Sequence, residues 1–300
     1  MTQIHPGSIV VGADGSPGSD QAVEWAAEQA ALERRPLVVF SATSQTPALV
    51  GAWPGPTEVF PADLLLKDVR AVATRAATLA THHRPGLAPE AVAVVGNPRT
   101  ELADLTAHAH LLVLGSRGRG PVSSKLLGSV GAFVTRHANC PVVVCRTGTY
   151  RHRRYGVLVG ADGTASSLPV IDFAFRQASL RSEPLTVLHS FDDVVATAEY
   201  SRLAYGSESN LEAQRLAVAE SVAGFGERYP EVRFSLQLAH GYAADSITAV
   251  ADRHDLVVIG HHPAETVADR VSVATATDVL ERSHTNIAVV PEPANHPSIS

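Results

Sequence analysis

Short runs of apolar residues alternate along the chain with longer segments whose apolar positions recur every three or four residues. A short continuous apolar run is typical of a strand buried on both faces, and the longer spacing is typical of an amphipathic helix. In the first half, this pattern predicts strands within 4–13 and at 37–40, 91–95, 111–114 and 142–145, and helices at 64–82 and 129–137.

Two further helices are predicted from their starting residues. Ser16-Pro17 and Asn97-Pro98 each place a side chain that can cap a helix before a proline that suits the first helical position. Strands and helices then alternate throughout, which favours a parallel sheet covered by helices on both faces. Right-handed crossovers turn this order into a doubly wound, five-stranded α/β sandwich.

The same pattern occurs twice in the chain. The run IVVGADGS begins at Ile9, and VLVGADGT begins at Val157, an offset of 148 residues. Farther along, Gly115 pairs with Gly260 at an offset of 145. The repeat predicts two tandem doubly wound parallel five-stranded sheets, with the second set of strands near Val157, Leu185, Val232, Leu256 and Ile287.

The domain boundaries follow from this repeat. The first domain is predicted at 1–146 and the second at 155–292, joined by the short polar segment 147–154. The basic residues in that segment are interpreted as a solvated linker. A chain of 300 residues with 45% apolar residues is long enough for two cores.

Composition excludes several classes of protein. The formal net charge is −6 and no basic stripe is present, so a nucleic-acid partner is not expected. No apolar run reaches the roughly 18 residues that a membrane-spanning helix needs, and 1–6 lacks signal-peptide regions. We therefore expect a cytoplasmic protein that is not bound to a membrane. Scarce lysine beside abundant arginine and alanine indicates a bacterial source. The two cysteines, Cys140 and Cys145, are expected to be buried thiols.

Two glycine-containing segments follow predicted strands at the edge where ligands of such sheets bind. The first runs from Gly12 to Ser16 after the first strand, and the second starts at Gly115 after the fourth. Glycine lets main-chain amides approach phosphate oxygens closely. The helix that begins at Ser129 adds free N–H groups and a dipole that favours an anion, and cationic residues lie nearby in sequence. These cations are Arg117, Arg119 and Lys125.

The second segment is not a P-loop, because it lacks the Gly-Lys-Ser/Thr ending. Asp14 has the wrong charge for a phosphate but can accept hydrogen bonds from ribose hydroxyls. The spacing Gly-x2-Gly-x9-Gly-Ser instead resembles the nucleotide motif of the universal stress proteins. It is formed by Gly115, Gly118, Gly128 and Ser129. The last two stand within LLGSV, and HANCPVVV follows at His137.

The resemblance covers nearly the whole chain as two repeats and implies a Rossmann-like fold similar to that of the adenine nucleotide alpha hydrolases. It implies that ATP, or sometimes AMP, binds in the first domain, with Asp14 at the base and ribose and the glycine motif at the phosphates. It also implies that the fifth strands pair between domains, here inside one chain. The predicted nucleotide-binding residues are Gly12, Ala13, Asp14, Ser16, Phe40, Gly115, Arg117, Gly118, Gly128, Ser129 and Val130.

The second copy lacks most of this motif. Pro263, Val273 and Ala274 stand opposite Gly118, Gly128 and Ser129, and each change opposes anion binding. The carboxylates of Glu265 and Asp269 oppose it too. We therefore expect a degenerate domain that serves as an internal dimer partner.

Three side-chain features remain open. His261-His262 could form part of a metal site, but adjacent side chains point apart and a solvated loop is favoured. Trp53, in the Pro/Gly-rich loop 46–61, could cover the nucleotide, although a mobile loop is favoured. His82-His83 is interpreted as a helix terminus.

Three functions are compatible with these residues. The first is an ATP-binding regulatory module of the stress response, read by an unknown protein partner or by a homodimer. The second is a slow ATPase or phosphotransferase, in which the phosphates and Ser129 would hold Mg²⁺. The third is a structural protein whose two sites are relics. We favour the first, a protein that is not an enzyme, because the loop offers no evident residue to activate water.

Overall fold

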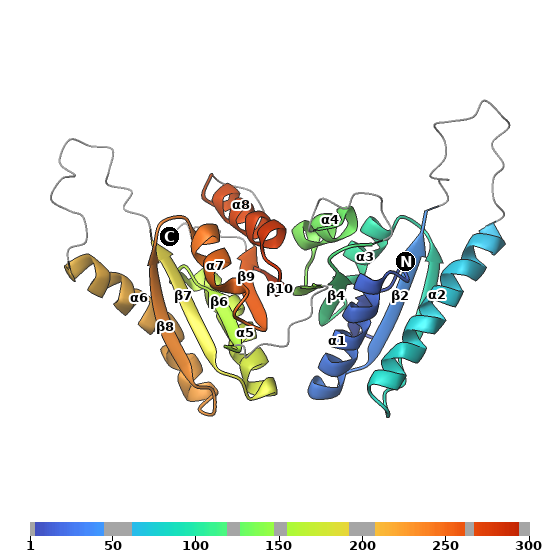
Figure 1. Ribbon diagram of the computed structural model, residues 1–300, viewed down its shortest axis with the longest axis horizontal. Helices are drawn as coiled ribbons and strands as arrows, with labels where there is room; N and C mark the ends of the chain where they lie inside the picture. Colours follow the sequence, from blue (N-terminus) through green and yellow to red (C-terminus); the bar gives the residue numbers. More distant parts are fainter. Residues whose placement is uncertain are drawn as a thin grey trace, which may run out of the picture. The chain divides into compact units, whose positions relative to one another are not determined.

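The computed structural model describes residues 4–44, 62–118, 127–146, 155–191, 208–261 and 267–293, without the side chains of 62, 208–210 and 267–273. The chain divides into two compact units, residues 1–147 and 148–300, which we call domain 1 and domain 2. In each unit, helices flank a sheet of parallel strands (Figure 1).

Domain 1 alternates strands and helices as the sequence predicts. Its elements are β1 (Ile9–Gly12), α1 (Pro17–Glu33), β2 (Leu37–Thr43), α2 (Ala62–His83), β3 (Glu90–Val95), α3 (Pro98–Leu105), β4 (Leu111–Gly115), α4 (Ser129–His137) and β5 (Val142–Cys145). The predicted helix starts are confirmed, because Ser16 caps α1 and Asn97 caps α3, each followed by a proline.

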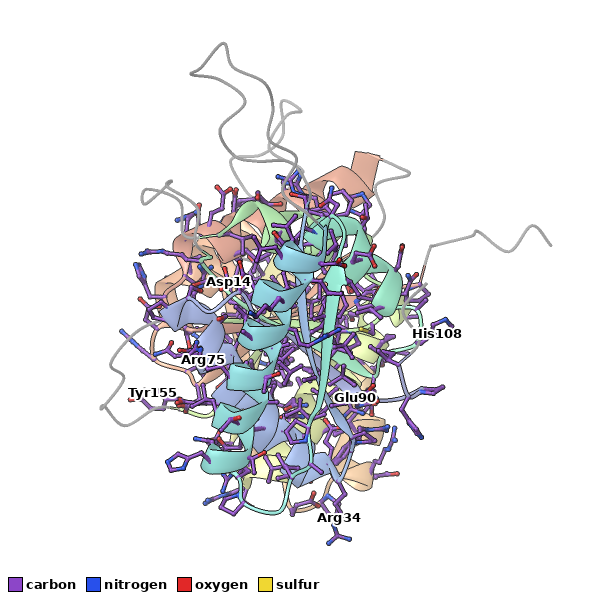
Figure 2. All side chains as sticks on the ribbon, turned by 90° about the vertical axis from the view of Figure 1, so that its right-hand side faces the viewer. Asp14, Arg34, Arg75, Glu90, His108 and Tyr155 are labelled. Atoms are coloured by element: carbon purple, nitrogen blue, oxygen red, sulfur yellow. The ribbon has the colours of Figure 1, made fainter. Side chains whose placement is uncertain are left out.

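The sheet of domain 1 has the order β3-β2-β1-β4-β5, and all neighbouring strands are parallel. The chain therefore reverses its direction of winding between β1 and β4. This switch point brings the segment after β1 and the segment after β4 to the same edge. Asp14 lies toward that end of domain 1, and Arg34 lies at the opposite end (Figure 2).

Burial explains the continuous apolar strands. Residues Ile9–Val11 and Leu111–Val113 are almost fully buried because helices cover both faces of the sheet. Helices α1 and α2 pack together, and so do α3 and α4. Edge strand β3 is only partly buried along its length, as expected for a strand with a single neighbour.

Domain 2 repeats the arrangement, with the order β8-β7-β6-β9-β10 and parallel neighbours. The strand expected near Val232 begins slightly later, because Val232 N–H donates to the Tyr229 carbonyl in a turn. The elements are β6 (Val157–Gly160), η1 (Ala165–Ser167), α5 (Leu168–Arg181), β7 (Leu185–Phe191), α6 (Glu208–Arg228), β8 (Phe234–His240), α7 (Ala243–Ala251), β9 (Leu256–His261), α8 (Val267–Arg282) and β10 (Asn286–Pro291).

Candidate functional site

The segment after β1 forms a tight turn held by the chain itself. Ala13 N–H donates to the Phe40 carbonyl at 2.8 Å, which joins this segment to β2. Asp14 Oδ1 accepts from Ser16 N–H at 2.9 Å, a turn closed by the carboxylate. Gly12 lies against β4, since a Cβ there would stand 2.7 Å from Leu114 Cδ2.

The end of β4 touches the start of α1. A Cβ on Gly115 would lie 2.6 Å from the main-chain carbon of Gly18, so only glycine allows this approach. Two residues after Gly115, the Arg117 carbonyl accepts a hydrogen bond from Ser16 Oγ at 3.2 Å. The start of α1 therefore fixes the first residues of the loop after β4.

The start of α4 is connected to the same loop. Ser116 N–H donates to the Cys145 carbonyl at 2.9 Å, and Gly128 N–H donates to the Ser116 carbonyl at 2.8 Å. Gly128 is the N-cap residue, and no side chain caps this helix. The first N–H groups of α4, beginning at the exposed Ser129, therefore keep the partial positive charge that attracts an anion.

These three segments bring predicted residues into one place. A Cβ on Gly118 would lie 2.5 Å from Asp14 Oδ2, and a Cβ on Gly128 would lie 3.9 Å from Gly118 N. We call Asp14, Gly118, Gly128 and Ser129 the strand-end cluster. A carboxylate and an open helix N-terminus thus flank one glycine, the arrangement that the sequence predicts for a ribose and phosphates.

The glycines of the motif serve different purposes. Gly115 is required by packing against α1, whereas Gly118 leaves room for the Asp14 carboxylate. Gly128 has φ −71° and ψ 158°, which any residue adopts, and an added Cβ would make only ordinary contacts. Among the described residues, neither conformation nor packing requires glycine at this position, and its small size leaves space at the start of α4.

Other predicted residues lie around the cluster with their side chains buried or exposed to different degrees. Phe40 is 1% exposed in the core of domain 1, so only its main chain borders the segment after β1. Arg117 is exposed, whereas Val130 at the start of α4 is partly buried against the core of domain 1. Arg119, Lys125 and the loop that contains Trp53 lie outside the described residues. Ala13 is buried beside Gly12.

Domain 2 differs at the corresponding edge. The side chain of Glu292, 8% exposed, packs over Gly260, where an added Cβ would overlap its carboxyl. Burial raises the pKa of Glu292 to about 8, and the charge of Asp162 adds to the rise. In domain 1 the matching glycine, Gly115, faces the backbone of α1 instead. Domain 2 therefore places an acid beside its strand ends.

A buried histidine lies near the end of β7 in domain 2. His189 is buried on β7, and its Nδ1 lies 2.8 Å from the Ala161 carbonyl oxygen. Its Nε2 lies 3.0 Å from Gln214 Oε1 on α6. Sequence reasoning missed both His189 and Glu292, although a signal existed: Ser41 of domain 1 corresponds to His189, and an acid follows the last strand.

The metal site considered at His261-His262 lies only partly within the described residues. No group of three or more metal-binding side chains occurs among the described residues. His261 is 8% exposed at the end of β9, whereas His262, Pro263 and Glu265 lie outside the described residues. The side chains of Asp269 and Val273 also lie outside them.

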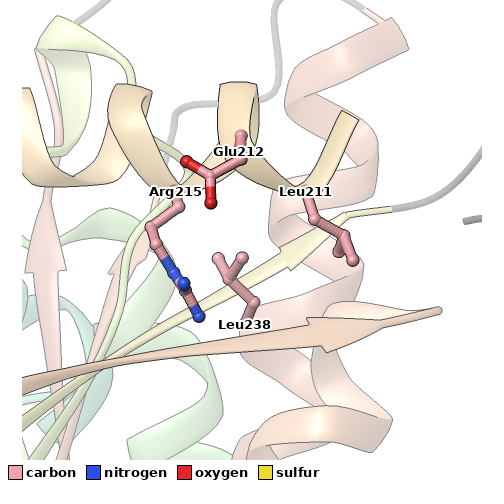
Figure 3. A pocket seen from close by; sticks show the side chains of 4 residues that line it. All are labelled: Leu211, Glu212, Arg215 and Leu238. Atoms are coloured by element: carbon pink, nitrogen blue, oxygen red, sulfur yellow. The ribbon is translucent and has the colours of Figure 1, made fainter. Parts of the chain in front are cut away.

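A hollow of about 440 Å³ lies between α6 and β8 of domain 2 (Figure 3). One guanidinium stands beside one carboxylate there, so the described part of the lining has no net charge and does not favour a polyphosphate. The four residues that line it are Leu211, Glu212, Arg215 and Leu238.

Comparison with known proteins agrees with the two-domain division. Residues 7–146 and 156–291 each match the universal stress protein family. The chain belongs to this family. A universal stress protein of Mycobacterium tuberculosis strain H37Rv is 31% identical over 296 residues, covering 95% of this chain and 96% of its own length.

Another member, from Mycobacterium bovis, is 33% identical over 261 residues, covering 85% of this chain and 86% of its own length. The crystal structure of a universal stress protein from Archaeoglobus fulgidus superposes with a TM-score of 0.71 at 16% identity, covering 95% of this chain and 98% of that one. At that identity the likeness shows the fold alone. Within the described residues, no helix combines the length and apolarity needed to cross a membrane.

Proposed function

We propose that domain 1 of this universal stress protein binds ATP and acts as a nucleotide-dependent regulatory module. One observation carries the proposal: the uncapped start of α4 lies beside Gly118, which itself lies against the Asp14 carboxylate. An open helix N-terminus favours phosphates, and a carboxylate favours ribose hydroxyls. Adenine is the base that the family resemblance implies.

Each part of the nucleotide has a matching group. The phosphates would meet main-chain N–H groups of Gly118, Ser129 and Val130, with Arg117 adding positive charge. The Asp14 carboxylate would accept from the ribose, and the main chain of Phe40 would border the adenine. Mg²⁺ would add positive charge at the phosphates, with the Ser129 hydroxyl as its protein ligand.

A regulatory role follows from what the cluster lacks. Hydrolysis needs a group that positions or activates water. The cluster's only carboxylate, Asp14, accepts from Ser16 N–H at the end assigned to the ribose, and the cluster's other members are two glycines and a serine. The bound nucleotide would then stay intact, and occupancy could be sensed by a protein partner or by a second copy of the chain.

We further propose that domain 2 does not bind the nucleotide and serves as the internal partner of domain 1. Glu292 packs over Gly260, the counterpart of Gly115 in the motif assigned to the phosphates. The buried His189 stands where Ser41 stands near the end of β2. The Glu292 side chain takes up space at that edge of the sheet and brings no positive charge, so it opposes the binding of a phosphate.

Isothermal titration calorimetry of the full chain with ATP tests both proposals. We expect saturable binding with a stoichiometry near one per chain. A stoichiometry near two would contradict the proposal for domain 2, and no binding would contradict the proposal for domain 1. Phosphate release measured on the same samples separates binding from the alternative of a slow ATPase, because sustained turnover would favour the enzyme.

Gly128→Val tests the space before α4. The backbone there suits any residue and a Cβ makes only ordinary contacts with the described residues, so domain 1 should fold while the valine side chain blocks the phosphates. We expect ATP affinity to fall about 10- to 100-fold, as expected when hydrogen bonds to a charged group are lost. Gly224→Val is the matched control, since nothing lies within 4 Å of a Cβ there. Unchanged affinity in Gly128→Val would contradict the phosphate assignment.

A further inference from the structure

Ser16 is buried and its hydroxyl has two partners. The side chain is 8% exposed. Its Oγ accepts from Ser19 N–H at 3.2 Å and donates to the Arg117 carbonyl at 3.2 Å. A hydroxyl has a single O–H donor, so Ser16 has none left for a ligand. Any effect of this hydroxyl on a phosphate must therefore pass through the loop after β4.

The bond to Arg117 sets the direction of the next N–H group. The Arg117 carbonyl and the Gly118 N–H belong to one peptide unit, which is planar and trans. In a trans peptide, C=O and N–H point in opposite directions. Because Ser16 draws the carbonyl toward the start of α1, the Gly118 N–H points away from α1. Gly118 N lies 3.9 Å from the position of a Cβ on Gly128, so this nitrogen lies near the start of α4.

The start of α1 approaches the same carbonyl at a second point. A Cβ on Gly18 would lie 2.8 Å from the Arg117 carbonyl oxygen. The oxygen is therefore held between a hydroxyl and a glycine, and it has little room to rotate. Two residues at the start of α1, its N-cap and Gly18, thus fix one peptide of the loop.

Domain 2 provides a comparison within the same chain. Thr164 stands where Ser16 stands in domain 1, but its Oγ1 donates to Asp162 Oδ1 at 2.8 Å and lies 2.7 Å from Ser166 Oγ. Thr164 makes no side-chain cap, and its helix begins with a short 3-10 turn. The hydroxyl is thus engaged by the aspartate in the copy that has lost the motif.

We propose that Ser16 is a positioning residue for the nucleotide of domain 1: its hydroxyl holds the Arg117–Gly118 peptide so that the Gly118 N–H faces a phosphate. The inference rests on the proposed ATP binding of domain 1. Ser16 would act on the nucleotide indirectly, by orienting the Gly118 N–H. Because only the phosphates would meet Gly118, the loss of Ser16 should weaken the binding of ATP but not of the nucleoside.

The experiment measures the affinities of the full chain for ATP and for adenosine by calorimetry. For Ser16→Ala we expect about tenfold weaker ATP binding, the size expected for one misplaced hydrogen bond to a charged group, and less than about twofold change for adenosine. Ser16→Thr, which keeps a donor and a cap, should bind ATP within about threefold of the parent protein.

Asn97→Ala is the control for a lost helix cap. Asn97 Oδ1 accepts from Arg99 N–H at 3.1 Å at the start of α3, so this variant loses a cap of the same kind elsewhere in domain 1. Its stability should fall as that of Ser16→Ala does, while its ATP affinity should stay unchanged. A purely structural role for Ser16 would make the two variants alike in both measurements.

Gly18→Ala is a second way to disturb the Arg117–Gly118 peptide, because its added Cβ would lie 2.8 Å from the Arg117 carbonyl oxygen. Alanine favours the helix more than glycine, so α1 should persist, while its Cβ would press on the Arg117 carbonyl. We expect the same selective loss of ATP affinity. This variant supplies the test if Ser16→Ala does not fold.

The outcomes separate the two claims. Selective loss of ATP affinity in Ser16→Ala or Gly18→Ala, with Asn97→Ala unchanged, supports the inference. Equal loss for ATP and adenosine, or unchanged ATP affinity, would overturn it while leaving the proposed function in place. A parent protein that binds neither compound would refute the proposed function itself, and with it this role of Ser16.

Discussion

At the scale of single residues, the equivalent aspartates of the two domains, Asp14 and Asp162, have different neighbours. In domain 1, Asp14 Oδ1 accepts from Ser16 N–H, and Oδ2 faces Gly118 across the strand-end cluster. In domain 2, Asp162 Oδ1 accepts from both the N–H and the hydroxyl of Thr164. An aspartate at the same position of the repeat thus makes different hydrogen bonds in the two domains, and the residue type alone does not predict them.

Asp14→Asn tests the role of this carboxylate. Asparagine keeps an oxygen for Ser16 N–H but removes the charge and replaces one acceptor with a donor. We expect ATP affinity to fall about tenfold or more, because hydrogen bonds to a charged group are worth about 1.5–3 kcal/mol. Calorimetry of the full chain measures this. Asp162→Asn is the matched control and should leave affinity and stoichiometry unchanged; an equal loss in both would contradict the assignment.

At the scale of elements, the site depends on how closely β4 approaches α1. Gly115 and Gly18 meet backbone to backbone, which lets Ser16 reach the Arg117 carbonyl. In domain 2, Ser166 stands where Gly18 stands, and Glu292 lies over the matching Gly260. The packing of one strand end against one helix start thus distinguishes the two copies.

Gly115→Ala should destabilise domain 1. Its Cβ would lie 2.6 Å from main-chain atoms of Gly18, which cannot yield as a side chain would. Overpacking of this kind costs about 1–3 kcal/mol in the free energy of unfolding. Urea denaturation followed by tryptophan fluorescence isolates the effect, because both tryptophans, Trp25 and Trp53, lie in domain 1.

Gly224→Ala serves as the control for this substitution. Gly224 lies in α6 with nothing within 4 Å of a Cβ, so alanine should maintain or increase the stability of domain 2. A Gly115→Ala protein with an unchanged tryptophan transition would show that β4 and α1 can move apart.

At the scale of the whole molecule, the two domains have the same fold but different chemical groups at the ends of their strands. Both domains share strand order and the motif aspartate, and both belong to the same family. Domain 1 presents an uncapped helix start, whereas domain 2 buries the Glu292 carboxyl beside Asp162. This asymmetry predicts one nucleotide per chain, and it also predicts that the two domains respond differently to pH.

Glu292 should make domain 2 less stable as pH rises. Its pKa is about 8 in the folded protein against an ordinary value of 4.5. Between these values the folded domain retains a proton that the unfolded chain has released, so the free energy of unfolding falls as pH increases toward 8. Glu292→Gln should remove this fall and be more stable than the parent protein above pH 8.

Tyrosine difference absorbance during urea denaturation measures this prediction, since all six tyrosines lie in residues 148–300. Glu220→Gln, at an exposed position of α6, is the control and should keep the pH dependence of the parent protein. The same pH dependence in Glu292→Gln would show that another group is responsible.

The sequence by itself determined the order of strands and helices, the helix starts at Ser16 and Asn97, and the division into two copies of a family fold. These features follow from local patterns, because periodicity, caps and the repeat are all visible within short stretches of chain. The glycine motif also predicted that Asp14 and Gly128 would share one place, since parallel strands end at the same edge.

Only the tertiary structure decided what each of these residues touches. It shows that Gly115 is required by α1, that the Ser16 hydroxyl is engaged by Arg117, and that Glu292 packs over Gly260. Ser16 and Arg117 are 101 residues apart in sequence. Such contacts depend on how separate elements pack in three dimensions, to fractions of an ångström, and no local pattern of residue types records that distance.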